Sequence, residues 1–403
     1  MKNSIKLLCF SALMSTFLFT PASMADATQK EWTFLIFLNA DNNLDRFGVN
    51  DVHEMEAVGS TDQVNIVVQF DRAYGKPAKR LYVKQGESDV VEEMGEVDMG
   101  DIDVFTDFVA WGTENYPAKK YAVVMWNHGS GWNKRQGDLT FKGISYDDQS
   151  GNHITTAQLG DGLKTIKENL GRNLDILAFD ACLMQMVEVA YAIRHEVDIM
   201  LASEEVEPGE GWAYTDSMQP IIENPTMTPG ETASVIVDTY DASYDGGSQG
   251  NRSTTQSWVR LSAMDTLIST LNAAAVELTG NFTNEMKATI KQVQKFYYRS
   301  NVDLVHFLAL MHEKISGSES ETANKAEILA TLNSAKAAAQ NFVGHSASHG
   351  SSMSNSHGVA IYVPGRGYSF SKKYKDLDFA KDNQWDEMLK AYYDRSKTTL
   401  ADL

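Results

Sequence analysis

Continuous apolar runs alternate with helix-like segments as far as about residue 240. The strongest apolar runs cover 32–40, 64–71, 121–132 and 174–182, and weaker ones cover 80–84 and 197–203. Between them, apolar residues recur at helical spacing in 44–58, 101–117, 155–171 and 183–195. Uninterrupted apolar strands are typical of a parallel sheet buried on both faces. The pattern therefore predicts an α/β fold with a mostly parallel sheet and helices on both sides.

The pattern changes after about residue 240. An Ala-rich region at 262–344 is expected to be mostly helical, and a last helix is expected at 383–395. The other expected elements are a Gly-rich loop at 245–255, a short strand at 256–261, a flexible loop at 346–356 and a late strand at 357–364. The chain therefore divides into an α/β domain at 26–240 and a mostly helical part at 241–403, which can add strands to the same sheet.

Residues 1–25 have the features of a secretory signal peptide. Lys2 and Lys6 precede a short apolar core, and Ser23-Met24-Ala25 is a small-residue cleavage site, so cleavage is expected after Ala25. A membrane anchor is the alternative, but the apolar run is short for a bilayer span and Pro21 follows it. We therefore expect a secreted or periplasmic protein. Its mature form keeps one cysteine, Cys182, and can form no internal disulfide.

The chain is strongly acidic. Its 54 acidic and 35 basic residues give a net charge of −19, and loss of the two signal-peptide lysines makes it −21. This charge argues against nucleic acid and anionic membranes as partners, and it suits cationic ones. No second long apolar run is present, so stable membrane insertion is not expected. We expect a monomer.

Two of the strong strands end in reactive residues. One leads into Asn127-His128-Gly129 and the other into Asp180-Ala181-Cys182. Parallel strands collect ligands and catalytic groups at their carboxyl ends, so an imidazole and a thiol are expected on the same edge of the sheet.

A nearby histidine favours the reactive thiolate of a cysteine. The helix expected from Leu183 would place its positive N-terminus at Cys182 and lower the thiol pKa further. Backbone N–H groups of Gly129 and Cys182 could hold an oxyanion, which completes an acyl-transfer site. The alternatives are a buried structural cysteine, and His153 in place of His128 as the base.

The segments "YAVVMWNHGSGW" and "LDILAFDACLM" resemble the two signature blocks of the clostripain family of cysteine peptidases. Four apolar residues before His-Gly, and four before Asp-Ala-Cys, form a wider pattern shared with caspases, legumains and gingipains. Further similar blocks are "WTFLIFLNADNNLD", "ASEEVEPGEGWAY" and "SHGVAIYVP". The resemblance covers about 31 to 395. It implies a caspase-like α/β/α sandwich in which His128 is the general base and Cys182 the nucleophile of a dyad.

The resemblance also implies cleavage after Arg, and often Lys, in protein or peptide substrates. Asp180 matches the family position at the base of the pocket for the P1 side chain, and it is two residues from Cys182, so both point to one side of a strand. The alternative for Asp180 is a helix N-cap. Glu210 matches an acid near the pocket mouth, although Glu204, Glu205 and Glu207 are close enough in sequence to replace it. Trp212 either walls the pocket or packs in the core.

Two regulatory features follow from the resemblance. Relatives cut themselves in the loop after the histidine, where this chain offers Lys134, Arg135 and Lys142; we favour Lys142, which would leave two associated chains. Ordinary surface cations are the alternative. Relatives are also commonly stimulated by calcium, so calcium is expected as an activator. No cofactor is expected for the chemistry itself. Asp147-Asp148 could bind calcium but does not match an EF-hand loop, and a solvated turn is the alternative.

Three other functions stay open at this point. One is a related cysteine hydrolase or transpeptidase with a different P1 preference, which would use the dyad without the acids. Another is a catalytically silent binding protein of the same fold. The third is a metal-sensing module. The intact His-Gly and Ala-Cys pair favours the peptidase.

Overall fold

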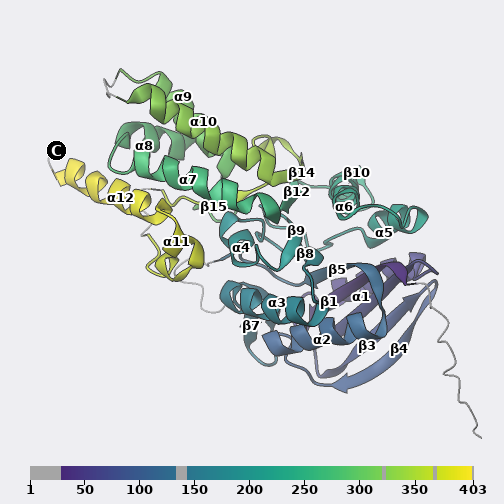
Figure 1. Cartoon of the computed structure of the whole chain (residues 1–403). Coiled ribbons are helices and arrows are strands. Elements are labelled where there is room, and N and C mark those ends of the chain that lie inside the picture. The colour runs from purple at the N-terminus through teal and green to yellow at the C-terminus, as the bar shows by residue number, and fades with distance from the viewer. Residues whose placement is uncertain (1–28, 133–142, 320–323, 366–369, 402–403) are drawn as a thin grey trace, which may run out of the picture.

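A computed structural model describes residues 29–132, 143–319, 324–365 and 370–401 (Figure 1). Its centre is a nine-stranded sheet with the order β14-β12-β9-β8-β5-β1-β2-β3-β4. The strands are β1 (Lys30–Ala40), β2 (Val64–Arg72), β3 (Lys76–Lys84), β4 (Glu87–Gly95), β5 (Ala118–Trp126), β8 (Leu174–Asp180), β9 (Val197–Ala202), β12 (Thr254–Arg260) and β14 (Val343–His349).

The five middle strands, β9, β8, β5, β1 and β2, run parallel, which confirms the predicted sheet. Nearly every residue of these strands is buried, as expected for a parallel sheet covered on both faces. Antiparallel strands complete the two edges, with β3 and β4 on one side and β12 and β14 on the other. The outermost β4 is mostly exposed and carries four acidic residues, which discourage pairing with another chain.

Helices cover both faces of the sheet. They are α1 (Asp45–Val58), α2 (Ile102–Asn115), α3 (Thr156–Leu170), α4 (Val187–Ala192), α5 (Tyr214–Glu223), α6 (Pro229–Tyr244), α7 (Met264–Leu278), α8 (Thr283–Gln292), α9 (Leu304–Ser316), α10 (Lys325–Phe342), α11 (Asp378–Asp382) and α12 (Trp385–Ala401). Short strands are β6 (Ile144–Asp147), β7 (Asn152–Ile154), β10 (Asp245–Gly247), β11 (Gly250–Asn251), β13 (Asn301–Asp303) and β15 (Ala360–Tyr362). Three 3₁₀ turns span Leu261–Ala263, Ser351–Met353 and Tyr374–Asp376.

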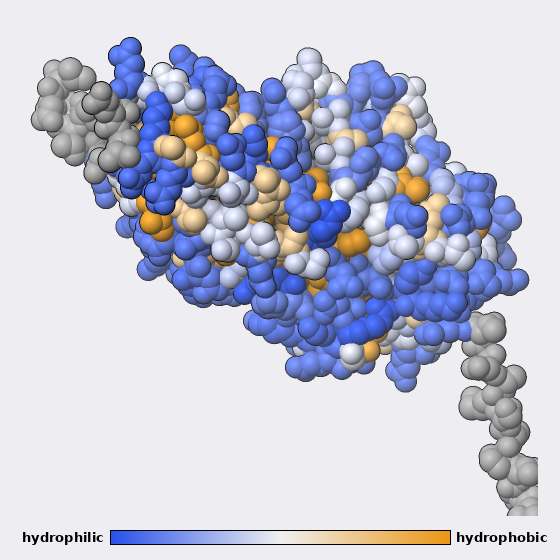
Figure 2. All heavy atoms as spheres, turned by 45° about the horizontal axis from the view of Figure 1, so that its top comes forward, coloured by the Kyte–Doolittle hydropathy of each residue, from blue (hydrophilic) through white to orange (hydrophobic). Residues whose placement is uncertain are grey.

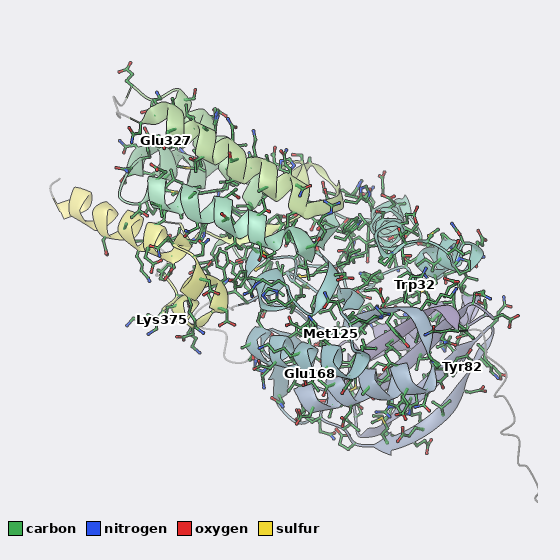
Figure 3. All side chains as sticks on the ribbon, in the orientation of Figure 1. Trp32, Tyr82, Met125, Glu168, Glu327 and Lys375 are labelled. Carbon is green, nitrogen blue, oxygen red and sulfur yellow. The ribbon has the colours of Figure 1, made fainter. Side chains whose placement is uncertain are left out.

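Two hydrophobic cores lie on opposite faces of the sheet, and strand periodicity decides which residue enters which. In β1, Phe34 and Ile36 join the core under α1, α5 and α6, whereas Leu35 and Phe37 join the core under α2 and α3. Met125 of β5, labelled in Figure 3, is fully buried in the second core. The result is the α/β/α sandwich that the resemblance implied.

The part after residue 240 extends this fold. Helix α6 runs across the expected division at 240, and β12 pairs with β9 of the central sheet. Helices α7, α9 and α10 lie together beyond the β12–β14 edge in Figure 1. Trp132, just after the histidine loop, packs edge-on against Tyr362 and Tyr374. The later part therefore supports the loops of the earlier one.

The expected helix at 183–195 is wrong at its start. Helix α4 begins only at Val187, and Leu183 has a left-handed φ of 66°. The backbone N–H of Leu183 donates to the carbonyl of Glu205, and that of Gln185 donates to the carbonyl of Ser203. These bonds to a distant segment hold 183–185 extended, so a helix cannot form there.

Three other expectations about strands and loops were wrong or incomplete. The first part of the expected loop at 346–356, as far as His349, belongs to strand β14. The polar sequence of β14 does not indicate a strand, and the strand forms by pairing with β12. The late strand is β15, which pairs with β13 and not with the central sheet. The mostly polar β4 was not expected at all. Strands β14 and β15 depend on partners that are distant in sequence, whereas β4 forms a hairpin with the preceding β3.

Among the described residues, no helix combines the length and apolarity that a membrane crossing requires. Figure 2 shows one face of the molecule on which hydrophilic residues predominate, with apolar ones scattered between them. The expected signal peptide lies outside the described residues.

Candidate active site

The sheet places the histidine and cysteine loops side by side. Strands β5 and β8 are parallel neighbours with Trp126 opposite Asp180, and His128 and Cys182 each follow two residues later. The backbone N–H of Asn127 donates to the carbonyl of Asp180 at 3.2 Å. The two loops therefore leave the same edge of the sheet in register.

Gly129 permits direct contact between these loops. A Cβ at this position would lie 2.4 Å from the carbonyl oxygen of Cys182 and 3.1 Å from the Cβ of Ala181. No larger residue fits without moving the backbone. Asn127 fixes the start of the histidine loop, because its Nδ2 donates to the carbonyls of Asn39 and Tyr146 at 2.6 and 3.0 Å. The glycine therefore serves the close approach of the two loops.

His128 is half-buried and held by Asn43, which follows β1. Its Nε2 lies 2.7 Å from Oδ1 of Asn43. Because an amide oxygen only accepts, this bond puts a proton on Nε2 and leaves Nδ1 as the basic nitrogen. Burial lowers the pKa of His128, and the charge of Asp148 opposes that shift. The ring is therefore neutral near pH 7, as a general base requires. No pattern in the sequence singles out Asn43.

The rival base, His153, has a different setting. Its ring stacks on Tyr146 with centroids 5.2 Å apart, and it belongs to β7. It therefore lies in the small β6–β7 sheet and not at the end of a central strand.

The Cys182 thiol is half-buried and bonded to the backbone of Glu207. Its Sγ accepts from the Glu207 N–H at 3.3 Å and donates toward the Glu207 carbonyl at 3.8 Å. Burial, followed by the charge of Glu207, raises the pKa of Cys182 to about 12. The expected help from a helix N-terminus is absent because α4 begins five residues later. In this conformation the thiol keeps its proton until a base removes it.

Asp180 is a buried carboxylate surrounded by donors. Its Oδ2 accepts from the Tyr214 hydroxyl at 3.0 Å and from the Trp212 N–H at 3.3 Å. The carboxyl of Glu207 also bonds to it. A Cβ at Gly211 would come within 2.8 Å of Oδ1, so the glycine leaves room beside the carboxylate. The N-cap alternative is wrong, because Met186 occupies that position of α4.

Asp180 and Glu207 share one proton. Burial raises the pKa of Asp180 to about 6, while its donors oppose the shift. Burial and the charge of Asp180 raise the pKa of Glu207 well above its ordinary value. Two carboxyl groups in contact cannot both ionise easily, so near neutral pH Glu207 holds a proton and donates it to Asp180.

Asp51 on α1 adds a third acid, which the sequence analysis missed. It is buried, accepts from the indole N–H of Trp126 at 2.6 Å, and has a pKa raised by burial and by Asp180. We call Asp51, Asp180 and Glu207 the Asp180 group. Within the described residues, no lysine or arginine offsets the charge of this group. A charged residue on the buried face of an amphipathic helix was the available signal for Asp51.

The other expected pocket residues are placed differently. Glu210 is half-buried, and its charge contributes to the raised pKa of Tyr244. The Trp212 ring lies in the core beside Tyr214, in line with the packing alternative. Glu204 bonds to Asp303 and to the Gly358 N–H, and Glu205 accepts from the N–H of Tyr297. Lys134, Arg135 and Lys142 lie outside the described residues.

A thiol, a neutral imidazole and a glycine loop on one edge of an α/β/α sandwich define the site class of a cysteine hydrolase. The profile of the clostripain family, peptidase family C11, matches residues 36–392. The chain therefore belongs to the clostripain family of cysteine endopeptidases, and the resemblance seen in the sequence is confirmed.

Individual relatives agree with this assignment. The chain is 29% identical to clostripain of Hathewaya histolytica in an alignment of 214 positions that covers 45% of this chain and 40% of that protein. A secreted C11 cysteine protease of Bacteroides thetaiotaomicron, bound to an irreversible peptide inhibitor, has a similar structure, with a TM-score of 0.67 and 21% identity over 89% of this chain and 99% of the other. An inactive zymogen C11 protease of Parabacteroides distasonis gives 0.66 and 20% over 88% and 99%. At these identities the structural likeness establishes the fold alone.

Proposed function

We propose that this chain is a secreted endopeptidase that cleaves peptide bonds after Arg or Lys. One observation carries the proposal: Asp51 and Asp180 are buried beside the nucleophile loop, Glu207 is half-buried with one enclosed carboxyl oxygen, and the group has no cationic partner among the described residues. Buried charges are normally paired or neutralised, and here Asp180 and Glu207 share a proton in place of a cation. A substrate guanidinium or ammonium supplies the missing positive charge.

The chemistry begins when substrate reaches the thiol. Nδ1 of His128 takes the proton from Sγ of Cys182, and the thiolate attacks the scissile carbonyl carbon. The N–H groups of Gly129 and Cys182 hold the resulting oxyanion. His128 then gives its proton to the leaving amine, the C–N bond breaks, and a thioester remains. Water, deprotonated by His128, hydrolyses the thioester and restores the thiol.

The acids act in binding and not in bond cleavage. A guanidinium offers a planar fork of N–H donors that suits two carboxylates, whereas an ammonium acts as a point charge. When either enters, it displaces the proton shared by Asp180 and Glu207. Contact with Asp180 favours Glu207 as the second acid, in the role that the resemblance gave to Glu210.

Three further features belong to the same proposal. Secretion is supported by the signal-like segment 1–25 and by the secreted relative of B. thetaiotaomicron. Self-cleavage at Lys142, with Arg135 and Lys134 as alternatives, is supported by the zymogen form of the P. distasonis relative. We propose a monomer that remains associated after such a cut, with calcium as an activator and no cofactor needed for the chemistry.

The test is hydrolysis of short peptides with Arg, Lys, Asn, Asp or Ala at P1. The mature protein is compared with Cys182→Ala, with and without calcium. We expect cleavage after Arg and Lys far faster than after Asn, Asp or Ala, and loss of about 10⁴-fold or more in Cys182→Ala. Equally fast cleavage after other residues would keep the dyad but remove the role of the Asp180 group. No cleavage at all, even after trypsin nicking of 133–145, would indicate a silent protein.

A silent protein of the same fold is the second candidate, and one observation favours it. The Cys182 thiol is bonded to Glu207, and no bond to His128 is present among the described residues. Two alkylating reagents separate the two candidates. A peptidase should be alkylated at Cys182 far faster by a peptidyl chloromethyl ketone than by iodoacetamide, whereas a silent protein should not discriminate between them.

A further inference from the structure

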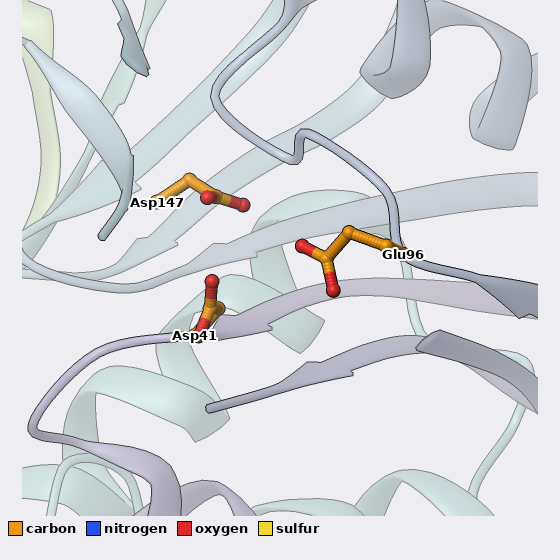
Figure 4. A group of neighbouring side chains, drawn as sticks. All are labelled: Asp41, Glu96 and Asp147. Atoms are coloured by element: carbon orange, nitrogen blue, oxygen red, sulfur yellow. The ribbon is translucent and has the colours of Figure 1, made fainter. Parts of the chain in front are cut away.

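A second set of carboxyl groups converges beside the histidine loop. Asp41 follows β1, Glu96 follows β4 and Asp147 ends β6, so the three come from distant parts of the chain. One oxygen from each lies within 4.8 Å of those of the other two. Figure 4 shows the three carboxyl groups directed toward one another. Asp41 and Asp147 are buried, and Glu96 lies exposed at the rim.

Asp71 of β2 supplies an independent observation. It is fully buried; Oδ1 accepts from the Arg72 N–H, but Oδ2 has no hydrogen-bond partner. Asp71 lies opposite Asn39 in the β1–β2 register, and the Asn39 side chain donates to Ser145 of β6. Paired residues of neighbouring strands point to the same face, so Asp71 is directed toward the face that carries β6 and Asp147. A buried oxygen without a donor is costly and points to a missing ligand.

No protein cation compensates these acids within the described residues. Arg72, the neighbour of Asp71, pairs with Asp45 at 2.8 Å instead. The donors that reach Asp41 and Asp147 are backbone N–H groups: Gln149 donates to Asp41 and Met99 to Asp147, each at 3.1 Å, and Ser150 donates to Asp147 at 2.8 Å. Ionised carboxylates as close as those of Asp41, Glu96 and Asp147 repel one another unless a positive ion lies between them, and Asp71 also interacts electrostatically with all three.

We propose that Asp41, Asp71, Glu96 and Asp147, here called the Asp41 group, bind one divalent cation, and that this cation is calcium. The group offers oxygen atoms only, without His or Cys, which selects a hard cation. Calcium accepts six to eight oxygens at about 2.3–2.6 Å, so ligands on opposite sides lie about 5 Å apart, in keeping with the observed spacing. Magnesium keeps several waters and rarely takes four carboxylates.

The site connects to His128 through short bonds. Asp41 is two residues before Asn43, which holds the His128 ring. The N–H of Asp148 donates to the Asp41 carbonyl at 2.8 Å, and Nδ2 of Asn42 donates to the Tyr146 carbonyl at 2.9 Å. A cation would therefore tie the end of β1 to β6, and both segments position the histidine loop. This makes the Asp41 group a positioning site, not part of the reacting centre.

Calorimetry and thermal melting test the site without relying on activity. The full chain carrying Cys182→Ala, which cannot cut itself, is titrated with calcium chloride and with magnesium chloride. The same is done after adding Asp71→Asn or Asp41→Asn, and after adding Asp161→Asn as a matched control on the exposed face of α3. We expect one calcium per chain and a melting temperature raised by about 4 °C at a hundredfold excess over Kd.

The variants give the proposal its sharpest outcome. Calcium should stabilise the parent and Asp161→Asn equally but leave Asp71→Asn and Asp41→Asn unchanged. Without calcium, Asp71→Asn should melt at or above the parent temperature, because the neutral amide keeps the shape of the side chain and cannot repel the other acids. No binding heat at millimolar calcium would overturn the proposal, as would equal stabilisation of all variants. An equal effect of magnesium would overturn the choice of calcium.

Discussion

Two acidic groups lie at the carboxyl edge of the same sheet, yet their surroundings differ. The Asp180 group accepts hydrogen bonds from Tyr214, Trp212 and Trp126 and holds a shared proton. The Asp41 group has backbone donors, one exposed acid and a buried oxygen of Asp71 that nothing satisfies. Both lack a cation among the described residues. The comparison indicates what each would bind.

The donors decide the type of cation. Aromatic side chains and hydrogen-bond donors around Asp180 suit an organic cation that can be bound in part and released after reaction. A set of bare oxygens suits a metal ion that satisfies several lone pairs at once. The same residue type, collected at the same edge by the same strand direction, can thus serve substrate choice in one place and positioning in the other.

The largest expected effect separates the two groups by single substitutions. Asp180→Asn should lower kcat/KM for Arg substrates by about 10²- to 10³-fold, because the entering guanidinium loses a buried partner. It should leave calcium binding unchanged. Asp71→Asn should have the opposite pattern: calcium binding should be lost, and the preference for Arg over Ala substrates should be kept.

Hydrolysis rates for matched Arg and Ala peptides, together with calorimetry, measure both effects. If Asp180→Asn and Asp71→Asn each reduced both properties alike, the two groups would not be separate sites. The Arg-to-Ala ratio is the decisive quantity, because a general loss of stability would lower both rates together.

A smaller effect distinguishes the acids in the loop after β9. Glu207→Gln should lower kcat/KM for Arg substrates by about 10- to 100-fold, as expected for loss of a buried charge-assisted bond. Its matched control, Glu210→Gln, should change it by less than about fivefold, because the bond to Asp180 belongs to Glu207 and an unpaired half-buried charge is screened by solvent. Steady-state kinetics of the two variants decide between them, and the opposite ranking would return the pocket role to Glu210.

The smallest effect is a pH dependence of binding. Asp180, with a pKa raised to about 6, loses its proton near that pH, and Glu207, with a pKa raised well above its ordinary value, keeps the shared proton at higher pH. A guanidinium prefers the ionised pair, so affinity should increase with pH from about 6 upward. The limit is tenfold per pH unit for each proton released.

Agmatine, a guanidinium without a scissile bond, is a suitable probe. Its Kd for the Cys182→Ala protein should fall as pH rises from 6 to 8, and Asp180→Asn should flatten the profile. A pH-independent Kd in the parent would show that no shared proton is displaced.

Local pattern was sufficient for much of the fold. Continuous apolar runs at 32–40, 64–71 and 174–182 identified buried parallel strands, because alternate residues of each must face one of two cores. Because parallel strands collect catalytic groups at their carboxyl ends, His128 and Cys182 were expected on one edge of the sheet. The register of β5 and β8 accords with that expectation. Local pattern failed at Leu183, where hydrogen bonds from 183–185 to 203–205 replace the first turn of the expected helix.

The sequence by itself therefore determined the strand order along the chain, the edge where chemistry gathers, and the thiol and imidazole on it. Only the tertiary structure decided which acids meet. Glu207 reaches Asp180, and Asp41, Asp71, Glu96 and Asp147 converge, because loops distant in sequence fold over the same edge. The raised pKa of Cys182 was decided there too. Burial and charge act through space, and the pattern along a chain records only its local neighbours.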